Sequence, residues 1–249
     1  MKLVDLSGKR ILVTGASSGI GRSCAILASR LGAQVVLTAR REDALRETLA
    51  AMECPSDHVV VPCDITDAVS VAELVGRAGK LDGLVHAAGI GPMCPIGFID
   101  KEHVESVFKT NYVSFLELMK HCSKLKNRNG RFSAVAVSSV SAQAGWGGVV
   151  VYCGSKGALS ASVRALAMEL APKGIRVNAV CPSNIRTPLY EAGSVDMNDE
   201  ASLKVLLAKQ PLGLGEPEQV ANAVAFLLSD ASSFITGVNL PVDGGYLAQ

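Results

Sequence analysis

Tyr152 and Lys156 have the types and spacing that suit proton transfer, because they lie four positions apart in a segment with helical character. Positions i and i+4 of a helix share one face. An ammonium beside a phenol stabilises the phenolate, so we expect the pKa of Tyr152 to fall from about 10 toward neutrality, where general acid–base catalysis works best. Ser139, thirteen residues before Tyr152, ends a predicted strand and can donate a hydrogen bond to a substrate oxygen. Taken alone, Tyr-x-x-x-Lys is more typical of an exposed helix face.

Three glycines, Gly15, Gly19 and Gly21, lie in the segment ILVTGASSGIGRS between an apolar run and an amphipathic stretch. Side chains at such a turn would keep a pyrophosphate away from the backbone N–H groups, and the helix N-terminus that follows adds positive potential. The spacing is G-x-x-x-G-x-G and not the more common G-x-G-x-x-G. Because the turn follows the first predicted strand, it indicates a dinucleotide-binding site.

The end of the second predicted strand reads Leu37-Thr38-Ala39-Arg40-Arg41 and carries no carboxylate. A carboxylate at this place usually binds the free ribose 2′-hydroxyl of NAD(H). An arginine can instead pair with a 2′-phosphate, and Arg40 is the better candidate of the two. The sequence therefore predicts NADP(H) in preference to NAD(H), with two arginines that only solvate a strand end as the alternative.

Short β-branched runs alternate with longer Ala- and Leu-rich stretches along the chain, which indicates a βαβ repeat. The expected strands are Arg10 to Thr14, Gln34 to Thr38, His58 to Val61, Gly83 to Val85, Phe132 to Val137, Arg176 to Val180 and Gly237 to Val242. The expected helices are Ile20 to Leu31, Glu42 to Met52, Val69 to Ala78, Lys101 to Lys126, Val149 to Ala171 and Glu216 to Leu228. The sequence thus predicts one α/β domain over residues 1–249, a doubly wound parallel sheet of about seven strands with helices on both faces. Residues 188–214, the least patterned segment, form a substrate lid in this interpretation.

The composition argues against several classes of partner. With 24 Lys+Arg, 23 Asp+Glu and a net charge of +1, the chain has no basic run that would gather nucleic acid or anionic lipid. No apolar run approaches the roughly 20 residues that cross a bilayer, and the N-terminus lacks the apolar core of a signal peptide. The seven cysteines form neither a disulfide framework nor a zinc-ligand pattern. We therefore expect a cytoplasmic protein without a metal, a membrane anchor or a nucleic-acid partner.

Short motifs recur from one end of the chain to the other. They are TGASSGIG at Thr14 to Gly21, AAG at Ala87 to Gly89, Asn111, Ser139, Tyr152, Lys156 and VDGG at Val242 to Gly245. Together they resemble the classical short-chain dehydrogenase/reductase family over nearly the whole chain. The resemblance implies a Rossmann-like fold and hydride transfer between a nicotinamide cofactor and a secondary alcohol or ketone, with Tyr152 as the general acid or base and transfer of the pro-S hydrogen.

The resemblance also implies roles for individual residues. Ser139, Tyr152 and Lys156 would be catalytic, and Asn111 would hold a water that links Lys156 to solvent. The implied cofactor-binding residues are Gly15, Ser17, Ser18, Gly19, Ile20, Gly21, Arg40, Asp64, Ile65, Ala87, Ala88, Gly89, Tyr152, Lys156, Pro182, Ile185 and Thr187. Asp64 would contact the adenine amino group, with a turn or N-cap aspartate as an equal alternative. Pro182, Ile185 and Thr187 would hold the nicotinamide carboxamide.

Two positions depart from the family pattern. His86 stands where the family usually has the Asn of NAAG, and we interpret it as a core histidine whose ring keeps the strand braced. Ser183 replaces the glycine that commonly follows Pro182, which leaves the backbone path beside the nicotinamide open.

The substrate end of the site is expected to involve Met93, Trp146 and Leu189, which make it partly apolar. An exposed loop position for Trp146 is nearly as good an interpretation. Acidic residues in the lid disfavour a strongly anionic substrate, or else form a solvated face. These residues are Glu191, Asp196, Asp199 and Glu200.

Three functional hypotheses follow. The first is an NADP(H)-dependent oxidoreductase that interconverts a secondary alcohol and a ketone, as in sugar, polyol or steroid dehydrogenases. The second is a 3-oxoacyl-acyl-carrier-protein reductase, for which Arg128 and Lys173 lie where the carrier-docking cations fall. The third, from another class, is a dinucleotide-binding sensor or scaffold without turnover. The resemblance further implies a homotetramer, with a dimer as the alternative.

Overall fold

One parallel sheet organises the chain in the computed structural model, which describes residues 4–193 and 200–249. Its seven strands follow the order β3-β2-β1-β4-β5-β6-β7, and every neighbouring pair is parallel. The strands are β1 (Arg10–Thr14), β2 (Gln34–Thr38), β3 (Val59–Val60), β4 (Leu81–His86), β5 (Arg128–Val137), β6 (Ile175–Pro182) and β7 (Asn239–Val242). The strand order reverses between β1 and β4, and ligands of such sheets bind at the carboxyl ends of the strands beside this point.

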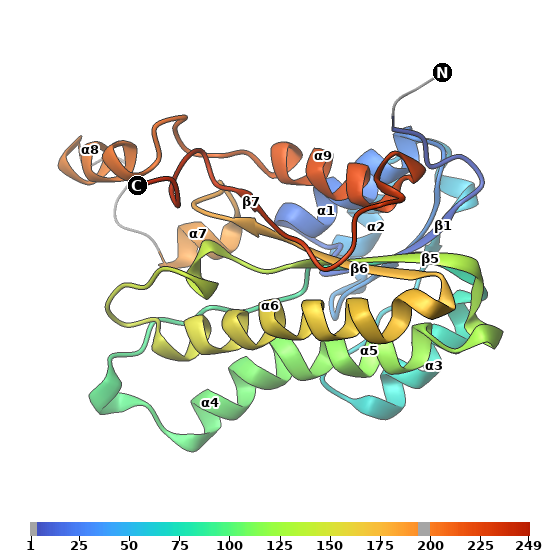
Figure 1. Cartoon of the computed structure of the whole chain (residues 1–249), viewed down its shortest axis with the longest axis horizontal. Coiled ribbons are helices and arrows are strands. Elements are labelled where there is room, and N and C mark those ends of the chain that lie inside the picture. Colours follow the sequence, from blue (N-terminus) through green and yellow to red (C-terminus); the bar gives the residue numbers. More distant parts are fainter. Residues whose placement is uncertain (1–3, 194–199) are drawn as a thin grey trace.

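Helices cover both faces of the sheet, as the sequence predicted (Figure 1). The helices are α1 (Gly19–Arg30), α2 (Glu42–Ala50), α3 (Ala68–Ala78), α4 (Lys101–Phe108), α5 (Ser114–Cys122), α6 (Val150–Leu170), α7 (Pro188–Gly193), α8 (Glu200–Lys209) and α9 (Pro217–Leu228). Side chains of α3, α5 and α6 build one buried apolar cluster with the sheet, and those of α1 and α9 build the other. The interior strand positions are apolar on both sides for this reason.

The helix expected over Lys101 to Lys126 is interrupted. A π-helical turn over Lys109–Val113 separates α4 from α5, and a short 3₁₀ turn, Leu125–Asn127, precedes β5. Asn111 lies in the π turn with no exposed surface, and its side-chain amide binds the main chain of Ile90. Such one-turn widenings re-aim a side chain without ending a helix, and apolar periodicity does not reveal them.

Other boundaries also differ from the prediction. β3 has only two residues. β5 begins at Arg128, four residues before the predicted start, and its pairing with β4 shifts register between Leu81 and Gly83. The segment 188–214 contains α7 and α8, which its sequence pattern did not predict. Val205 and Leu207 on α8 are 61% and 42% exposed, so this helix offers little apolar periodicity to detect. Over residues 4–193 and 200–249, no helix combines the length and the apolar character that a membrane crossing requires.

Candidate active site

A cavity of about 1250 Å³ opens where β1, β4, β5 and β6 end. It brings together every residue that the sequence predicted for the site except Asn111. The lining includes Gly15, Ser17, Ser18, Gly19, Ile20, Gly21, Arg40, Asp64, Ile65, Ala87, Ala88, Gly89, Met93, Ser139, Trp146, Tyr152, Lys156, Pro182, Ile185, Thr187 and Leu189. Residues from both halves of the chain therefore meet at the point where the strand order reverses.

The glycine turn between β1 and α1 packs so closely against the main chain that side chains on Gly15 and Gly21 would collide with backbone atoms. Gly15 and Gly19 have φ values of 66° and 51°, in the left-handed region that favours glycine. A Cβ on Gly21 would lie 2.3 Å from the Gly15 carbonyl oxygen, and one on Gly15 would lie 2.8 Å from the Ala88 nitrogen. The turn thus leaves the N-terminus of α1 open to the cavity, and this shape fits the pyrophosphate of a dinucleotide.

Arg40 follows β2 at the rim of the cavity and is exposed. It has no ion pair among the residues that the structure describes. Asp64, across the same end of the cavity, accepts hydrogen bonds from the Thr66 backbone N–H and hydroxyl at 2.9 and 2.8 Å. These bonds lower the pKa of Asp64, and Arg40 contributes further. Asp64 is therefore both a turn aspartate and a cavity residue.

Ser139, Tyr152 and Lys156 converge on the cavity from β5 and α6. The Ser139 hydroxyl, 7% exposed, donates to Ser141 Oγ at 3.0 Å and accepts from the Ser141 backbone N–H at 3.1 Å. Lys156 Nζ donates to the Val137 carbonyl at 2.8 Å and lies 5.6 Å from the centre of the Tyr152 ring. Gly91 packs against that ring, because a Cβ there would lie 3.1 Å from Tyr152 Cδ2. The three side chains thus occupy one wall of the cavity.

The pKa of Tyr152 differs from the prediction. Burial raises the pKa of Tyr152, and interaction with the Ser139 side chain only partly opposes the effect. The expected fall toward neutrality is therefore wrong, because desolvation of the buried phenol dominates. Burial also lowers the pKa of Lys156 to about 8. The lysine is the group of this pair that titrates near neutrality.

Asn111 does not line the cavity but lies directly behind it. Its amide donates to the Ile90 carbonyl at 2.8 Å and to Ser155 Oγ at 3.0 Å, and its side-chain oxygen accepts from the Ile90 backbone N–H at 2.8 Å. These bonds join the segment after β4 to α6. Asn111 therefore fixes the segment that carries Gly89 and Gly91 into the cavity.

His86 and Ser183, the two residues that depart from the family pattern, both form hydrogen bonds in the structure. His86 has no exposed surface, and its Nδ1 lies 3.3 Å from Thr14 Oγ1. Burial lowers the pKa of His86 to about 3, with a smaller contribution from Lys156. Ser183 donates to the Asp243 carbonyl at 2.9 Å and so ties the segment after β6 to the C-terminal turn.

Arg128 does not present its charge on the surface, where a carrier protein could dock. Its side chain is only 7% exposed, and its guanidinium donates to the main-chain carbonyls of Ser123 and Gly130. The expectation that it could receive a carrier protein is wrong, because this arginine closes the loop before β5 instead of presenting its charge. Lys173 remains exposed.

Three side chains that were expected to contact a substrate lie partly exposed in the lining of the cavity. Met93, Trp146 and Leu189 are 59%, 45% and 46% exposed and line it as predicted. Of the acidic residues that were expected in a lid, Asp196 and Asp199 lie outside the described residues, and so does the side chain of Glu200. Among the residues that are described, no group of three or more His, Cys, Asp or Glu side chains could hold a metal ion.

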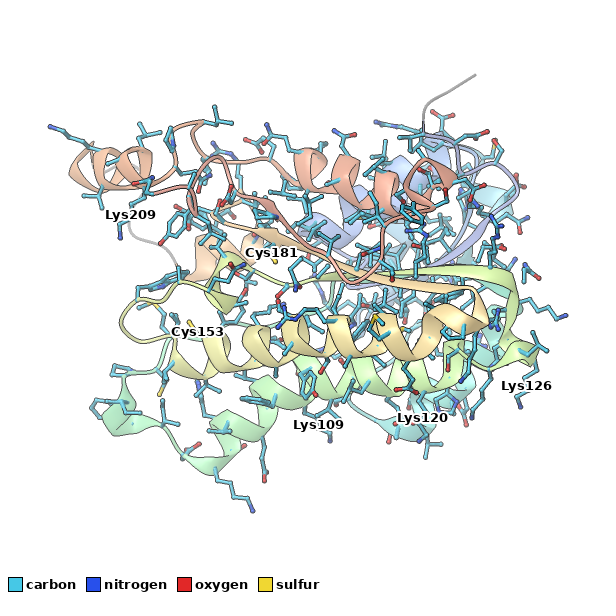
Figure 2. The ribbon with its side chains drawn as sticks, in the orientation of Figure 1. Lys109, Lys120, Lys126, Cys153, Cys181 and Lys209 are labelled. Atoms are coloured by element: carbon cyan, nitrogen blue, oxygen red, sulfur yellow. The ribbon has the colours of Figure 1, made fainter. Side chains whose placement is uncertain are left out.

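Several lining residues had no signal in the sequence. Tyr246 near the C-terminus and Lys209 at the end of α8 line the cavity, and Figure 2 shows Lys209 beside the α8 ribbon. Gln210, which follows Lys209 in the chain, has no exposed surface. Its side chain donates to the carbonyls of Asn184 and Gly213, and accepts from the Asn184 backbone N–H. A polar residue before a proline carries no pattern that distinguishes this buried link from a surface glutamine.

Comparisons with known proteins agree with this geometry. The profile of the family described as Enoyl-(Acyl carrier protein) reductase matches residues 15–247. The chain is 36% identical over 247 residues to L-xylulose reductase of Mus musculus, covering 98% of this chain and 99% of that protein. It is 35% identical over 250 residues to 3-oxoacyl-[acyl-carrier-protein] reductase of Rickettsia felis, covering 98% and 99%.

Solved structures show the same fold. A short-chain type dehydrogenase/reductase from Mycobacterium ulcerans superposes with a TM-score of 0.92 at 31% identity, over 99% of this chain and 92% of that one. A 7α-hydroxysteroid dehydrogenase complexed with NADH and 7-oxo glycochenodeoxycholic acid superposes with a TM-score of 0.90 at 30% identity, over 97% and 95%. With the seven-stranded parallel sheet, the glycine turn and the matched motifs in place, the chain belongs to the classical short-chain dehydrogenase/reductase family and is an oxidoreductase.

Proposed function

We propose that this protein uses NADP(H) to interconvert a secondary alcohol and a ketone on a small free substrate. The observation that carries the proposal is the convergence of Ser139, Tyr152 and Lys156 on the cavity that also contains the glycine turn. The relatives include reductases of a free sugar and of a carrier-bound acyl chain, and the solved neighbours include a steroid dehydrogenase. The burial of Arg128 favours a free substrate over a carrier-bound one.

The chain's own residues supply binding and proton transfer in this mechanism. When bound, the nicotinamide exchanges a hydride with the substrate carbon. The Ser139 hydroxyl donates a hydrogen bond to the carbonyl oxygen and stabilises the charge that develops there. Tyr152 donates its phenolic proton to the same oxygen in reduction and accepts it in oxidation. Lys156 holds an ammonium one helical turn from Tyr152, and its field stabilises the phenolate that forms.

The cofactor would lie with its pyrophosphate on the glycine turn. Pro182, Ile185 and Thr187 line the cavity beyond the end of β6, which supports their assignment to the carboxamide end. Asn111 braces the site and leaves its main-chain carbonyl as the group that could hold a water near Lys156.

We also expect a homotetramer, with a dimer as the alternative, because Phe234 and Met168 are almost fully and 78% exposed. Light scattering measures that state. We still expect the protein in the cytoplasm, because the pattern of its cysteines does not indicate a disulfide framework.

The substrate class is tested by following NADPH oxidation with a panel of ketones. The panel holds L-xylulose, a 7-oxo steroid and an acetoacetyl thioester, the last both free and on acyl carrier protein. We expect turnover of a free ketone. A kcat/KM that is highest for the carrier-bound thioester would support the 3-oxoacyl reductase instead. Cofactor binding without turnover of any member would support the sensor or scaffold.

The choice between NADPH and NADH is tested by Arg40→Ala. A charge-assisted hydrogen bond contributes about 1.5–3 kcal/mol, so we expect the KM for NADPH to rise roughly 10- to 100-fold while the KM for NADH stays nearly the same. Arg46→Ala is the matched control, because Arg46 pairs with Glu42 at 2.6 Å on the exposed face of α2. Equal effects of Arg40→Ala on both cofactors would contradict the 2′-phosphate assignment, and Arg41→Ala then tests the neighbouring arginine.

A further inference from the structure

Gln210 directly follows α8 and is a buried polar residue that the mechanism above does not use. It has no exposed surface, and it does not line the cavity. A buried amide needs partners for its two N–H groups and for its oxygen. The side-chain nitrogen donates to the carbonyls of Asn184 and Gly213 at 3.1 and 2.6 Å. The side-chain oxygen accepts from the backbone N–H and the side-chain amide of Asn184, both at 3.3 Å. Three of the four bonds of Gln210 therefore go to Asn184.

These bonds let the Gln210 side chain take the place of a neighbouring strand beside Asn184. The amide bonds both the backbone N–H and the carbonyl of this one residue, and such backbone groups need partners when they lie in the interior. The residues that follow are paired by main chain. Ile185 forms a parallel bridge with Gly215, and the Arg186 N–H donates to the Gly215 carbonyl at 2.8 Å. Gln210 thus begins a short pairing that fixes the main chain from Asn184 to Arg186.

The C-terminal turn is bonded to the chain at both ends of this link. The Gly244 carbonyl accepts from the Leu212 N–H at 3.2 Å. The Asp243 carbonyl accepts from the Ser183 hydroxyl at 2.9 Å. A Cβ on Gly244, whose φ is 61°, would lie 2.8 Å from Gln210 Cγ, so glycine at this position leaves the space that the glutamine side chain occupies. The link is therefore held in a fixed place and is not an isolated surface contact.

The segment that Gln210 fixes carries two residues that are proposed above to hold the carboxamide end of the cofactor. Ile185 and Thr187 follow Asn184 and line the cavity. Thr187 also lies against the glycine turn, since a Cβ on Gly19 would lie 3.2 Å from Thr187 Cγ2. A segment that is already ordered loses less conformational entropy when a ligand binds, and this raises the affinity. The order of this segment in the free protein therefore affects how tightly the nicotinamide end is bound.

We propose that Gln210 is a positioning residue for the nicotinamide end of the cofactor: through Asn184 it holds Ile185 and Thr187 in place before the cofactor binds. Without the glutamine amide, the Asn184 N–H loses the acceptor that the structure gives it, and the segment leaves this position for part of the time. The apparent dissociation constant then rises in inverse proportion to the fraction of protein that keeps the binding conformation. This inference rests on the cofactor site proposed above.

Gln210→Met tests the proposal, because methionine keeps the length of the side chain and forms none of the four bonds. Calorimetry compares NADPH with 2′-phospho-ADP-ribose, which lacks the nicotinamide ring. We expect the dissociation constant of NADPH to rise roughly tenfold and that of 2′-phospho-ADP-ribose to change less than about twofold. If NADH is the tighter cofactor of the wild type, NADH and ADP-ribose form the corresponding pair. Equal changes for the two ligands, or an unchanged affinity for the dinucleotide, would overturn the proposal.

Asn178→Leu is the matched control. Asn178 has no exposed surface and does not line the cavity, and its amide also links two main-chain groups. It donates to the Ile235 carbonyl at 3.0 Å and accepts from the Val238 N–H at 3.1 Å. Its loss should lower the midpoint of thermal unfolding and change the dissociation constant of NADPH less than about twofold. A loss of NADPH affinity as large as that of Gln210→Met would show that any buried amide has this effect, and would overturn the proposal.

Hydrogen exchange provides a second measurement, which does not depend on the folding of a variant. The Asn184 N–H of the cofactor-free wild type should be protected, and this protection should fall in Gln210→Met. An Asn184 N–H that exchanges in the free wild type as fast as an unfolded amide, and is protected only with NADPH, would overturn the proposal even if Gln210→Met does not fold. Neither measurement needs turnover, so cofactor binding without reduction of any ketone would refute the proposed reaction alone.

Discussion

Replacing Tyr152 with phenylalanine is expected to lower kcat about 10²- to 10⁴-fold, which is the range that a positioned general acid contributes. The change removes one oxygen and keeps the ring that packs against Gly91. Because the ring contacts remain, the affinity for NADPH and the midpoint of thermal unfolding should change little. Stopped-flow measurement of NADPH oxidation, together with a fluorescence titration of the cofactor, separates these quantities.

Tyr112→Phe provides the matched control for this experiment. The Tyr112 hydroxyl lies 3.0 Å from Ser162 Oγ, and Tyr112 does not line the cavity. Its loss should cost about 0.5–1.5 kcal/mol of stability and leave kcat unchanged. A Tyr152→Phe variant that turns over at the rate of the control would show that another group supplies the proton.

Lys156→Met is expected to lower kcat by about 10² or more and to raise the KM for the cofactor, since it removes both the ammonium and one of the proposed cofactor-binding side chains. Lys156 is 5% exposed, so the methionine occupies a buried place that suits its apolar chain. Lys126→Met on the exposed loop before β5 is the control and should change neither parameter (Figure 2). Equal kinetics for the two variants would contradict the role of Lys156.

The same substitution should change how stability depends on pH. Burial lowers the pKa of Lys156 from 10.5 to about 8, so between these values the unfolded chain binds a proton that the folded protein does not. The free energy of unfolding of the wild type therefore rises with pH through this window, and the cost of burying the charge is present in full below it. Lys156→Met lacks this cost. Its stability relative to the wild type should be greatest near neutral pH and should decline toward pH 10.5 in urea titrations.

The sequence predicts the parts of the site that depend on local spacing. Gly15, Gly19 and Gly21 follow the first strand, and Tyr152 and Lys156 are one helical turn apart, so each group is recognisable without knowledge of the fold. The α/β class could also be predicted from the sequence, because apolar strands and amphipathic helices alternate and have different periods. The structure adds that Ser139, which is distant from the glycine turn along the chain, shares one cavity with it.

Other features depend on tertiary contacts and were missed for that reason. Asn111 binds the main chain of Ile90 from the π turn, and apolar periodicity reveals neither the turn nor that bond. The direction of the Tyr152 pKa was wrong, because spacing alone gives the distance to a charge and says nothing of desolvation. Arg128 looked like a surface cation, yet its guanidinium donates to the main-chain carbonyls of Ser123 and Gly130. Gln210 and Tyr246 reach the site only through the folding of the C-terminal segment.

The central claim is that the Lys156 ammonium tunes Tyr152 once the cofactor is bound, and titration of the Tyr152 phenolate tests it most directly. The ultraviolet difference between wild type and Tyr152→Phe isolates this one phenol, in the free protein and in its complex with NADP⁺. We predict a raised pKa in the free protein, a lower pKa in the complex, and no such lowering in the Lys156→Met background. A Tyr152 pKa that stays raised in the complex, or that falls equally without Lys156, would contradict the account.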